Sequence, residues 1–211
     1  MKIKCVAFDA DNTLYSTREA AKFADSAAID VLAREINQPR DILYNEWQKT
    51  VAKIKDSKDP KMRNRMYSYG KLADKFGAAN TVNKMYAKMM EIVLKKIELL
   101  PGVKEILSKL KNKKIKLFVI TEDEDREKAL SKLKNLGILD YFDGVITSTD
   151  VGTMKPSEKY YTEILTVFSP SEILAVGDNA EKDLVIPAQL GIQTLLIENS
   201  VDLKKIEALV K

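Results

Sequence analysis

The sequence of 211 residues contains no histidine and a single cysteine, Cys5. Without histidine the protein has no Ser-His-Asp triad, no imidazole base and no imidazole metal ligand. A single cysteine excludes an intramolecular disulfide, as is typical of a reducing compartment, and it also excludes zinc sites rich in cysteine. The chemistry that remains open depends on carboxylates, lysine, threonine and a hard cation.

Long hydrophobic runs and a large excess of one charge are also absent. No apolar run approaches the length that spans a bilayer, and the first ten residues, MKIKCVAFDA, lack the apolar core of a secretory signal. The net charge of +4 is weak for a nucleic-acid binder. We therefore expect a cytoplasmic protein that binds neither membranes nor nucleic acids and is a monomer or a homodimer.

Five short apolar runs have the length of buried strands. They are residues 3–8, 115–120, 143–148, 173–178 and 193–198. Helical periodicity is expected in the later intervals, over residues 103–111, 126–137, 158–168 and 183–191. The alternation of strand and helix predicts an α/β fold, with a parallel sheet and helices on both of its faces.

A long helical stretch interrupts this alternation between the first and second runs. Breaks at residues 37–39, 56–60 and 77–80 divide it into four predicted helices, with no convincing strand. We therefore expect a small helical domain over residues 16–96. The core domain then comprises residues 1–15 and 97–211.

Polar side chains follow four of the predicted strands, and parallel strands place such ends along one edge of the sheet. In chain order these side chains are Asp9, Asp11, Thr121, Lys155, Asp178 and Asp183. Several carboxylates, one hydroxyl and one amine at a common edge indicate a site for a metal-bound phosphate. Carboxylate oxygens suit Mg²⁺, so Mg²⁺ is the expected cofactor.

The same segments resemble the haloacid dehalogenase-like (HAD) hydrolases. The matching pieces are DADNT (9–13), a hydrophobic strand ending in Thr121, MKP (154–156) and GDNAEKD (177–183), and they occur in the family's order. The resemblance implies a Rossmann-like core with the strand order 3-2-1-4-5. It also implies that the inserted helices form the family's small helical cap.

The resemblance further implies roles for the motif residues. Asp9 would be the nucleophile that forms an aspartyl-phosphate. Asp11 would protonate the leaving oxygen and then deprotonate the attacking water, with its backbone carbonyl on the metal. Thr121 would hydrogen-bond a phosphate oxygen, and Lys155 would neutralise nucleophile and phosphate. The implied metal ligands are Asp9, Asp11, Asp178 and Asp183.

The implied activity is Mg²⁺-dependent hydrolysis of a small-molecule phosphate ester. The sequence leaves open a phosphomutase or another phosphotransferase of this family, and also a non-catalytic phosphate-binding or regulatory protein on the same scaffold. A dehalogenase would not need the second acid, Asp11. A receiver-type signalling domain has about half this length and no helical insert.

Substrate binding is predicted for residues near the phosphate site and in the insert. Residues 15–95 carry sixteen Lys/Arg against ten Asp/Glu, and Arg63 and Arg65 are the predicted anion-binding residues of that insert. Asn12 and Glu122 are the predicted substrate contacts of the core. The acidic run Glu122–Asp125 and Lys182 depart from the family pattern. We expect the acidic run either to point outward or to disfavour highly charged substrates. We expect Lys182 to pair with Asp178 or Asp183, or to reach the substrate.

Overall fold

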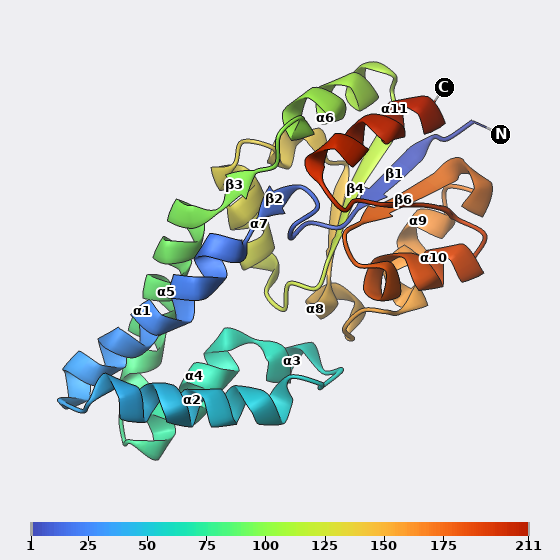
Figure 1. Ribbon diagram of the computed structural model, residues 1–211. Coiled ribbons are helices and arrows are strands. Elements are labelled where there is room, and N and C mark those ends of the chain that lie inside the picture. The colour runs from blue at the N-terminus through green and yellow to red at the C-terminus, as the bar shows by residue number, and fades with distance from the viewer. Residues whose placement is uncertain (1, 211) are drawn as a thin grey trace. The chain divides into compact units, whose positions relative to one another are not determined.

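The computed structural model describes residues 2–210, which divide into two compact units. One unit comprises the described residues up to Ser16 and those from Glu98 onward, and Thr17–Ile97 form the other. The first is built of strands and helices and the second of helices (Figure 1). Within residues 2–210, every helix is too short or too polar to cross a lipid bilayer.

Five parallel strands form the sheet of the α/β unit, in the order β5-β4-β1-β6-β7. Their bounds are β1 Cys5–Phe8, β4 Lys116–Thr121, β5 Gly144–Thr147, β6 Ile173–Gly177 and β7 Gln193–Leu196. Counted along the chain within this sheet, the order is 3-2-1-4-5, and the Rossmann-like α/β fold is confirmed. Strands β1 and β6 are buried along their whole length, which explains why their sequences are apolar without alternation.

Helices cover both faces of this sheet. They are α6 Val103–Asn112, α7 Arg126–Asn135, α8 Ser148–Val151, α9 Thr162–Leu165, α10 Val185–Gln189 and α11 Lys204–Leu209. Helix α6 packs against α11 on one side of the sheet, and α9 and α10 lie on the other (Figure 1). The buried residues of α6 are Val103, Ile106, Leu107 and Leu110, the spacing of one helical face.

Two predicted helices are shorter than expected. Residues 158–168 form a 3₁₀ turn over Glu158–Tyr161 before the single turn of α9. Residues 183–191 begin in a π-helical turn, Ala180–Leu184, and α10 starts after it. Pro187 lacks a backbone N–H, so it fits in the first turn of α10 and not deep inside a longer helix.

A two-stranded antiparallel ribbon stands where the chain leaves the α/β unit and returns to it. Strand β2 (Tyr15–Ser16) pairs with β3 (Glu98–Leu99), and the Leu100 N–H donates to the Leu14 carbonyl at 3.0 Å. The sequence predicted no strand between the first two runs, and this was wrong. Strands of two residues are too short to show a recognisable hydrophobic pattern.

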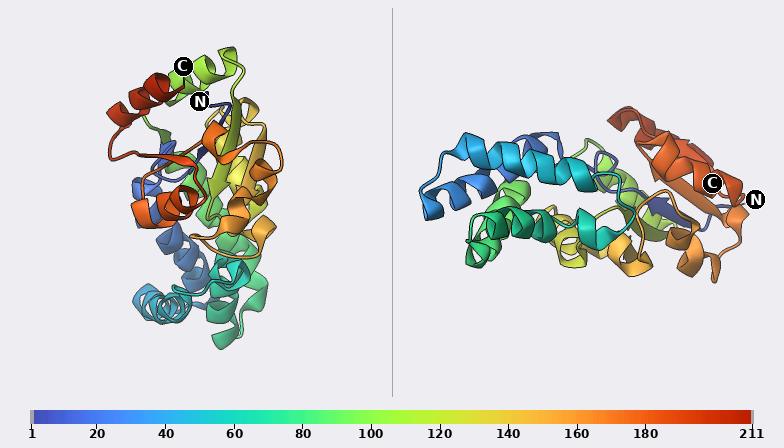
Figure 2. Two further views of the ribbon diagram at one scale, coloured as in Figure 1. Left: turned by 90° about the vertical axis from the view of Figure 1, so that its right-hand side faces the viewer. Right: turned by 90° about the horizontal axis from the view of Figure 1, so that it is seen from below.

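The helical unit contains α1 Arg18–Ile36, α2 Arg40–Ile54, α3 Pro60–Arg63, α4 Arg65–Lys75 and α5 Val82–Lys96. Helices α1 and α5 run alongside each other (Figure 2). The small side chains of Ala20, Ala24 and Ala28, one turn apart on α1, are buried. The short helix α3 was not predicted; it begins where the Asp59 side chain accepts the Lys61 N–H.

Candidate active site

The loop after β1 holds two carboxylates one residue apart. The Asp9 N–H donates to the Val176 carbonyl at 2.8 Å, which continues the β1–β6 pairing up to Asp9. The loop then turns sharply, because Asn12 has a positive φ of 63° and its N–H donates to the Tyr15 carbonyl at 2.7 Å. The Thr13 hydroxyl donates to Asp9 Oδ2 at 3.1 Å, so the Asp9 carboxylate is oriented by its own loop.

A buried lysine joins Asp9 to a second aspartate. Lys155 Nζ lies 2.7 Å from Asp9 Oδ1 and 2.8 Å from Asp183 Oδ1, and all three side chains are largely buried. Burial alone would lower the pKa of Lys155, but the two carboxylates outweigh burial and raise it above its ordinary value. We call Asp9, Lys155 and Asp183 the Lys155 triad.

The Asp183 side chain is held close to the end of β6. Its Oδ2 accepts the Asn179 N–H at 3.0 Å. A Cβ on Gly177 would lie 2.4 Å from the Asp183 Cβ, a distance that real Cβ atoms do not reach. Glycine at 177 is therefore required by this close approach, and the approach aims Asp183 at Lys155.

Three carboxylates gather at this edge of the sheet. Oxygens of Asp9, Asp178 and Asp183 lie within 4.8 Å of one another. Burial raises the pKa of Asp9 to about 7 although Lys155 opposes the rise, and Asp183 adds to it. Burial, with Asp183 second, also raises the pKa of Asp178. When all three carboxylates are ionised, the one lysine leaves two excess negative charges, and an all-oxygen donor set of this charge fits a hard divalent cation such as Mg²⁺.

Asp11 does not belong to that carboxylate set within the part of the chain that the structure describes. Its Oδ1 instead accepts from Lys132 Nζ at 2.7 Å. Lys132, from α7, is 2% exposed, and it also meets Asp123 Oδ2 at 2.7 Å. We call Asp11, Lys132 and Asp123 the Lys132 triad. The predicted metal contact of Asp11, through its backbone carbonyl, stays a prediction.

Sequence reasoning did not single out Lys132 or Asp123. Lys132 stands three residues after Ala129 and next to Leu133, on the buried face of α7. A lysine at an apolar position of an amphipathic helix was the available signal, since lysine is rarely fully buried without a partner.

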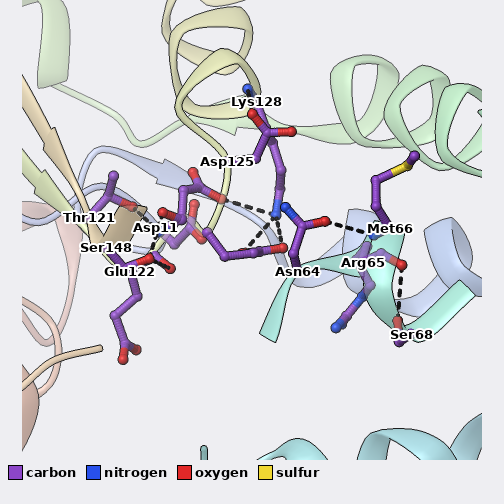
Figure 3. A network of polar contacts seen from close by, with 12 residues as sticks. Asp11, Asn64, Arg65, Met66, Ser68, Thr121, Glu122, Asp125, Lys128 and Ser148 are labelled. Carbon is purple, nitrogen blue, oxygen red and sulfur yellow. Dashed lines mark hydrogen bonds and ion pairs between the residues drawn. The ribbon is translucent and has the colours of Figure 1, made fainter. Parts of the chain in front are cut away.

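The acidic run after β4 points in several directions and not only outward. Asp123 is buried, and its N–H donates to Thr121 Oγ1 at 3.2 Å. Asp125 accepts the Glu127 and Lys128 N–H groups and so begins α7. The Ser148 hydroxyl donates to the Glu122 carbonyl at 3.2 Å, which joins the ends of β4 and β5 (Figure 3).

A cavity of about 210 Å³ brings most of the predicted core residues together. It is lined by Asp9, Asp11, Asn12, Thr121, Glu122, Asp178, Asn179, Lys182 and Asp183. Across it, Lys182 Nζ lies 2.5 Å from Glu122 Oε2. Sequence reasoning offered Asp178, Asp183 or substrate as the partner of Lys182. The structure pairs it with Glu122, and contact with the substrate stays a prediction.

The two predicted arginines lie in the helical unit, and each contacts a neighbour there. Arg63 Nη1 donates to the Lys55 carbonyl at 2.5 Å. Arg65 Nε donates to Asp25 Oδ1 at 2.9 Å, and its guanidinium stands 5.7 Å from the centre of the Trp47 ring. The Asn64 side chain accepts the Met66 N–H at the start of α4 (Figure 3). Substrate binding by Arg63 and Arg65 stays a prediction.

Comparison with known proteins identifies the family. Residues 3–191 match the description "haloacid dehalogenase-like hydrolase". The chain belongs to this family. The match confirms the predicted resemblance and, together with relatives named as phosphatases, the prediction that the chain is an enzyme.

Two curated relatives and one solved structure are similar over nearly the whole chain. The glyceraldehyde 3-phosphate phosphatase of Methanocaldococcus jannaschii is 30% identical over 92% of this chain and 85% of its own. The ribulose-1,5-bisphosphate 5-phosphatase of Halopiger xanaduensis is 28% identical over 92% of this chain and 84% of its own. The crystal structure of a HAD phosphatase from Thermococcus onnurineus has a TM-score of 0.74 at 23% identity, covering 98% of this chain and 99% of that one.

Proposed function

We propose that this hydrolase is a Mg²⁺-dependent phosphatase that acts on a small phosphomonoester through an aspartyl-phosphate on Asp9. The observation that carries the proposal is the setting of Asp9. It is paired with Lys155 at 2.7 Å, it lies in the carboxylate cluster, and Asp11 follows two residues later on the same cavity.

In the first step an Asp9 oxygen attacks phosphorus, and the bond from phosphorus to the ester oxygen breaks. Asp11 gives a proton to the departing alkoxide, so the alcohol leaves neutral. In the second step water attacks phosphorus and passes a proton to Asp11, while the bond from phosphorus to Asp9 breaks. Together the two steps return Asp9 to its ionised state and Asp11 to its protonated state, and the second step releases inorganic phosphate.

The remaining residues supply charge and orientation. Lys155 neutralises Asp9 and the incoming phosphate, and the Thr121 hydroxyl, which lines the cavity, donates to a phosphate oxygen. Asp9, Asp178 and Asp183 would hold Mg²⁺, with the Asp11 carbonyl as a further ligand. When bound, the cation supplies positive charge to the phosphate oxygens. Phosphoryl transfer requires little more from a protein than positioning and charge neutralisation.

The cavity and the relatives both support one substrate class. A cavity of about 210 Å³ suits a phosphate group with a short carbon chain. The relatives in Methanocaldococcus jannaschii and Halopiger xanaduensis are named for phosphates of a three-carbon and a five-carbon sugar. We therefore propose a small sugar phosphate as the substrate of this chain.

The experiment that tests this function measures phosphate release from a panel of small phosphomonoesters, with and without Mg²⁺. The panel includes glyceraldehyde 3-phosphate, ribulose 1,5-bisphosphate, phosphoglycolate and nucleoside monophosphates. We expect Mg²⁺-dependent release, fastest with a sugar phosphate. Isomerisation of a sugar phosphate without phosphate release would indicate a phosphomutase, and binding without turnover of any member would contradict the enzyme assignment.

A further inference from the structure

In the Lys132 triad a buried ammonium group contacts Asp11, the second carboxylate after β1. The Lys132 amine lies 2.7 Å from both Asp11 Oδ1 and Asp123 Oδ2. Lys132 and Asp123 are each 2% exposed, whereas the Asp11 side chain is 43% exposed. A buried amine has lost its hydration, so it is stable only where its ionic partners are fixed and well placed. The Lys132 side chain is therefore the less mobile partner in its contact with Asp11.

The other contacts of the triad explain this rigidity. Asp123 Oδ1 also meets Lys128 Nζ at 3.0 Å, and the Asp123 N–H donates to the Thr121 hydroxyl at the end of β4. The Lys132 amine stands 5.2 Å from the centre of the Tyr15 ring, which is fully buried. Lys132 is thus held by α7, by the loop after β4 and by an aromatic ring.

We propose that Lys132 is a positioning residue that holds the Asp11 carboxylate where it exchanges a proton with the leaving oxygen. This inference rests on the proposed function, because it gives Asp11 the acid role in phosphate ester cleavage. An exposed carboxylate on a loop otherwise samples several rotamers. Misplacement of a reacting group by 1 Å costs as much as about a hundredfold in rate.

The inference makes the effect of Lys132 depend on the leaving group. 4-Nitrophenyl phosphate releases a stable phenolate that needs little proton donation, whereas glyceraldehyde 3-phosphate releases an alkoxide that needs a proton. Lys132→Met, which keeps the length of the side chain and removes its charge, should lower kcat/KM on glyceraldehyde 3-phosphate by about ten- to a hundredfold. The same variant should change kcat/KM on 4-nitrophenyl phosphate by about threefold or less, a difference that general structural damage would not produce. We compare kcat/KM because it covers the steps up to release of the alcohol, whereas kcat also includes hydrolysis of the aspartyl-phosphate, in which Asp11 acts on both substrates alike.

Lys128→Met is the matched control. Lys128 lies one turn earlier on α7 and pairs with Asp123 and Glu124, neither of which lines the cavity. Its removal disturbs the same buried group of charges, so any loss of rate that it causes should be equal for the two substrates. If Lys128→Met shifts the ratio of the two kcat/KM values as much as Lys132→Met does, the effect is structural and the inference is wrong.

A second comparison uses Asp11→Asn as the background. If Lys132 acts through Asp11, adding Lys132→Met to Asp11→Asn should not change the ratio of the two kcat/KM values further. A further change in that background would overturn the inference. Should Lys132→Met fail to fold by circular dichroism, Lys132→Arg replaces it. The larger planar guanidinium moves the donor, so it should shift the ratio in the same direction, and an unchanged ratio would overturn the inference.

The same assay separates failure of this inference from failure of the proposed function. If the unmodified protein hydrolyses both substrates and Asp11→Asn slows the alkyl ester selectively, the proposed function stands. An unchanged ratio in Lys132→Met then contradicts the positioning role alone. If the unmodified protein hydrolyses neither of these two substrates nor any member of the panel in Mg²⁺, the proposed function and this inference both fail.

Discussion

Each of the two aspartates after β1 pairs with a buried lysine, but the two pairs have different surroundings. Each meets the amine of a lysine that is at most 5% exposed, at 2.7 Å, and each lysine bridges to a second buried aspartate. The Lys155 triad adjoins Asp178, so three carboxylates there face one amine. In the Lys132 triad Asp123 also meets Lys128, a second amine.

This difference determines what each aspartate needs from outside the protein. With its carboxylates ionised, the Lys155 triad with Asp178 carries two excess negative charges, which a divalent cation balances. The first step of the proposed reaction requires a protonated Asp11, and the Lys132 triad with Lys128 and Glu124 then has two carboxylates against two amines. We infer that the Asp9 carboxylate depends on the metal as well as on its lysine, whereas the Asp11 side chain is held by groups of the protein.

Removal of divalent cations should have the largest effect, since it leaves the Lys155 cluster with its full excess charge. Excess chelator is expected to reduce phosphate release to background. Mg²⁺ should restore it best, with Mn²⁺ or Co²⁺ as substitutes. Circular dichroism before and after chelation controls for unfolding, and full activity in chelator would contradict the account.

Lys155→Met should lower kcat by about 10²- to 10³-fold, as loss of one strong charge-stabilising donor typically does. In contrast to Lys132→Met, the loss should be similar for 4-nitrophenyl phosphate and glyceraldehyde 3-phosphate, because Lys155 contacts the nucleophile. Removing one partner of a buried ion pair also costs roughly 3–5 kcal/mol of stability. Thermal melting must therefore show that the variant is folded at the assay temperature. A loss confined to glyceraldehyde 3-phosphate would mean that Lys155 acts in the same way as Lys132, and it would contradict the comparison.

Gly177→Ala should have an intermediate effect, because the new Cβ would displace Asp183 from Lys155 and from the carboxylate cluster. We expect a stability loss of about 1–3 kcal/mol from overpacking. We also expect a higher Mg²⁺ concentration for half-maximal activity. Gly70→Ala is the control, since nothing lies within 4 Å of its Cβ position in the interior of α4. There alanine should be neutral or stabilising, and similar behaviour of the two variants would refute the prediction.

Acid sensitivity of the Lys132 triad should be the smallest effect. Burial would raise the pKa of Asp123, but Lys128 and Lys132 outweigh it and hold the pKa at about 2, below the ordinary 3.8. A lowered pKa stabilises the folded state above pH 4, and this contribution disappears as the pH falls toward 2. The contribution is about 2 kcal/mol at neutral pH.

Urea unfolding between pH 5 and 2 measures this contribution by comparing the unmodified protein with Asp123→Asn. The stability difference between the two proteins should shrink as the pH falls through that range. A difference that stays constant with pH would show that Asp123 is not held ionised by its lysines.

Much of the Lys155 side of the site could be predicted from the sequence. Asp9, Thr121 and Asp178 each stand directly after a buried apolar run, and parallel strands bring such ends to one edge of a sheet. Lys155 and Asp183 also follow predicted strands, but the family pattern was needed to give them roles, because their distance in sequence from a strand does not determine where their side chains point.

The Lys132 side of the site could not be predicted in the same way. Whether a lysine is buried depends on partners from other elements, here a loop after β1 and a loop after β4. Asp123 in an acidic run looks like a helix-start residue, and that role falls to Asp125 instead. The ribbon of β2 and β3 was missed because four residues carry no periodicity.

Detection of a phosphoryl group on Asp9 tests the central claim most directly. The protein is mixed with glyceraldehyde 3-phosphate and Mg²⁺, quenched in acid during turnover, digested and analysed by mass spectrometry, with Asp9→Asn as the control. The account predicts one phosphoryl group on the peptide that contains Asp9, sensitive to hydroxylamine as an acyl phosphate is, and neither label nor turnover in the folded Asp9→Asn protein. Near-normal turnover by Asp9→Asn would contradict it.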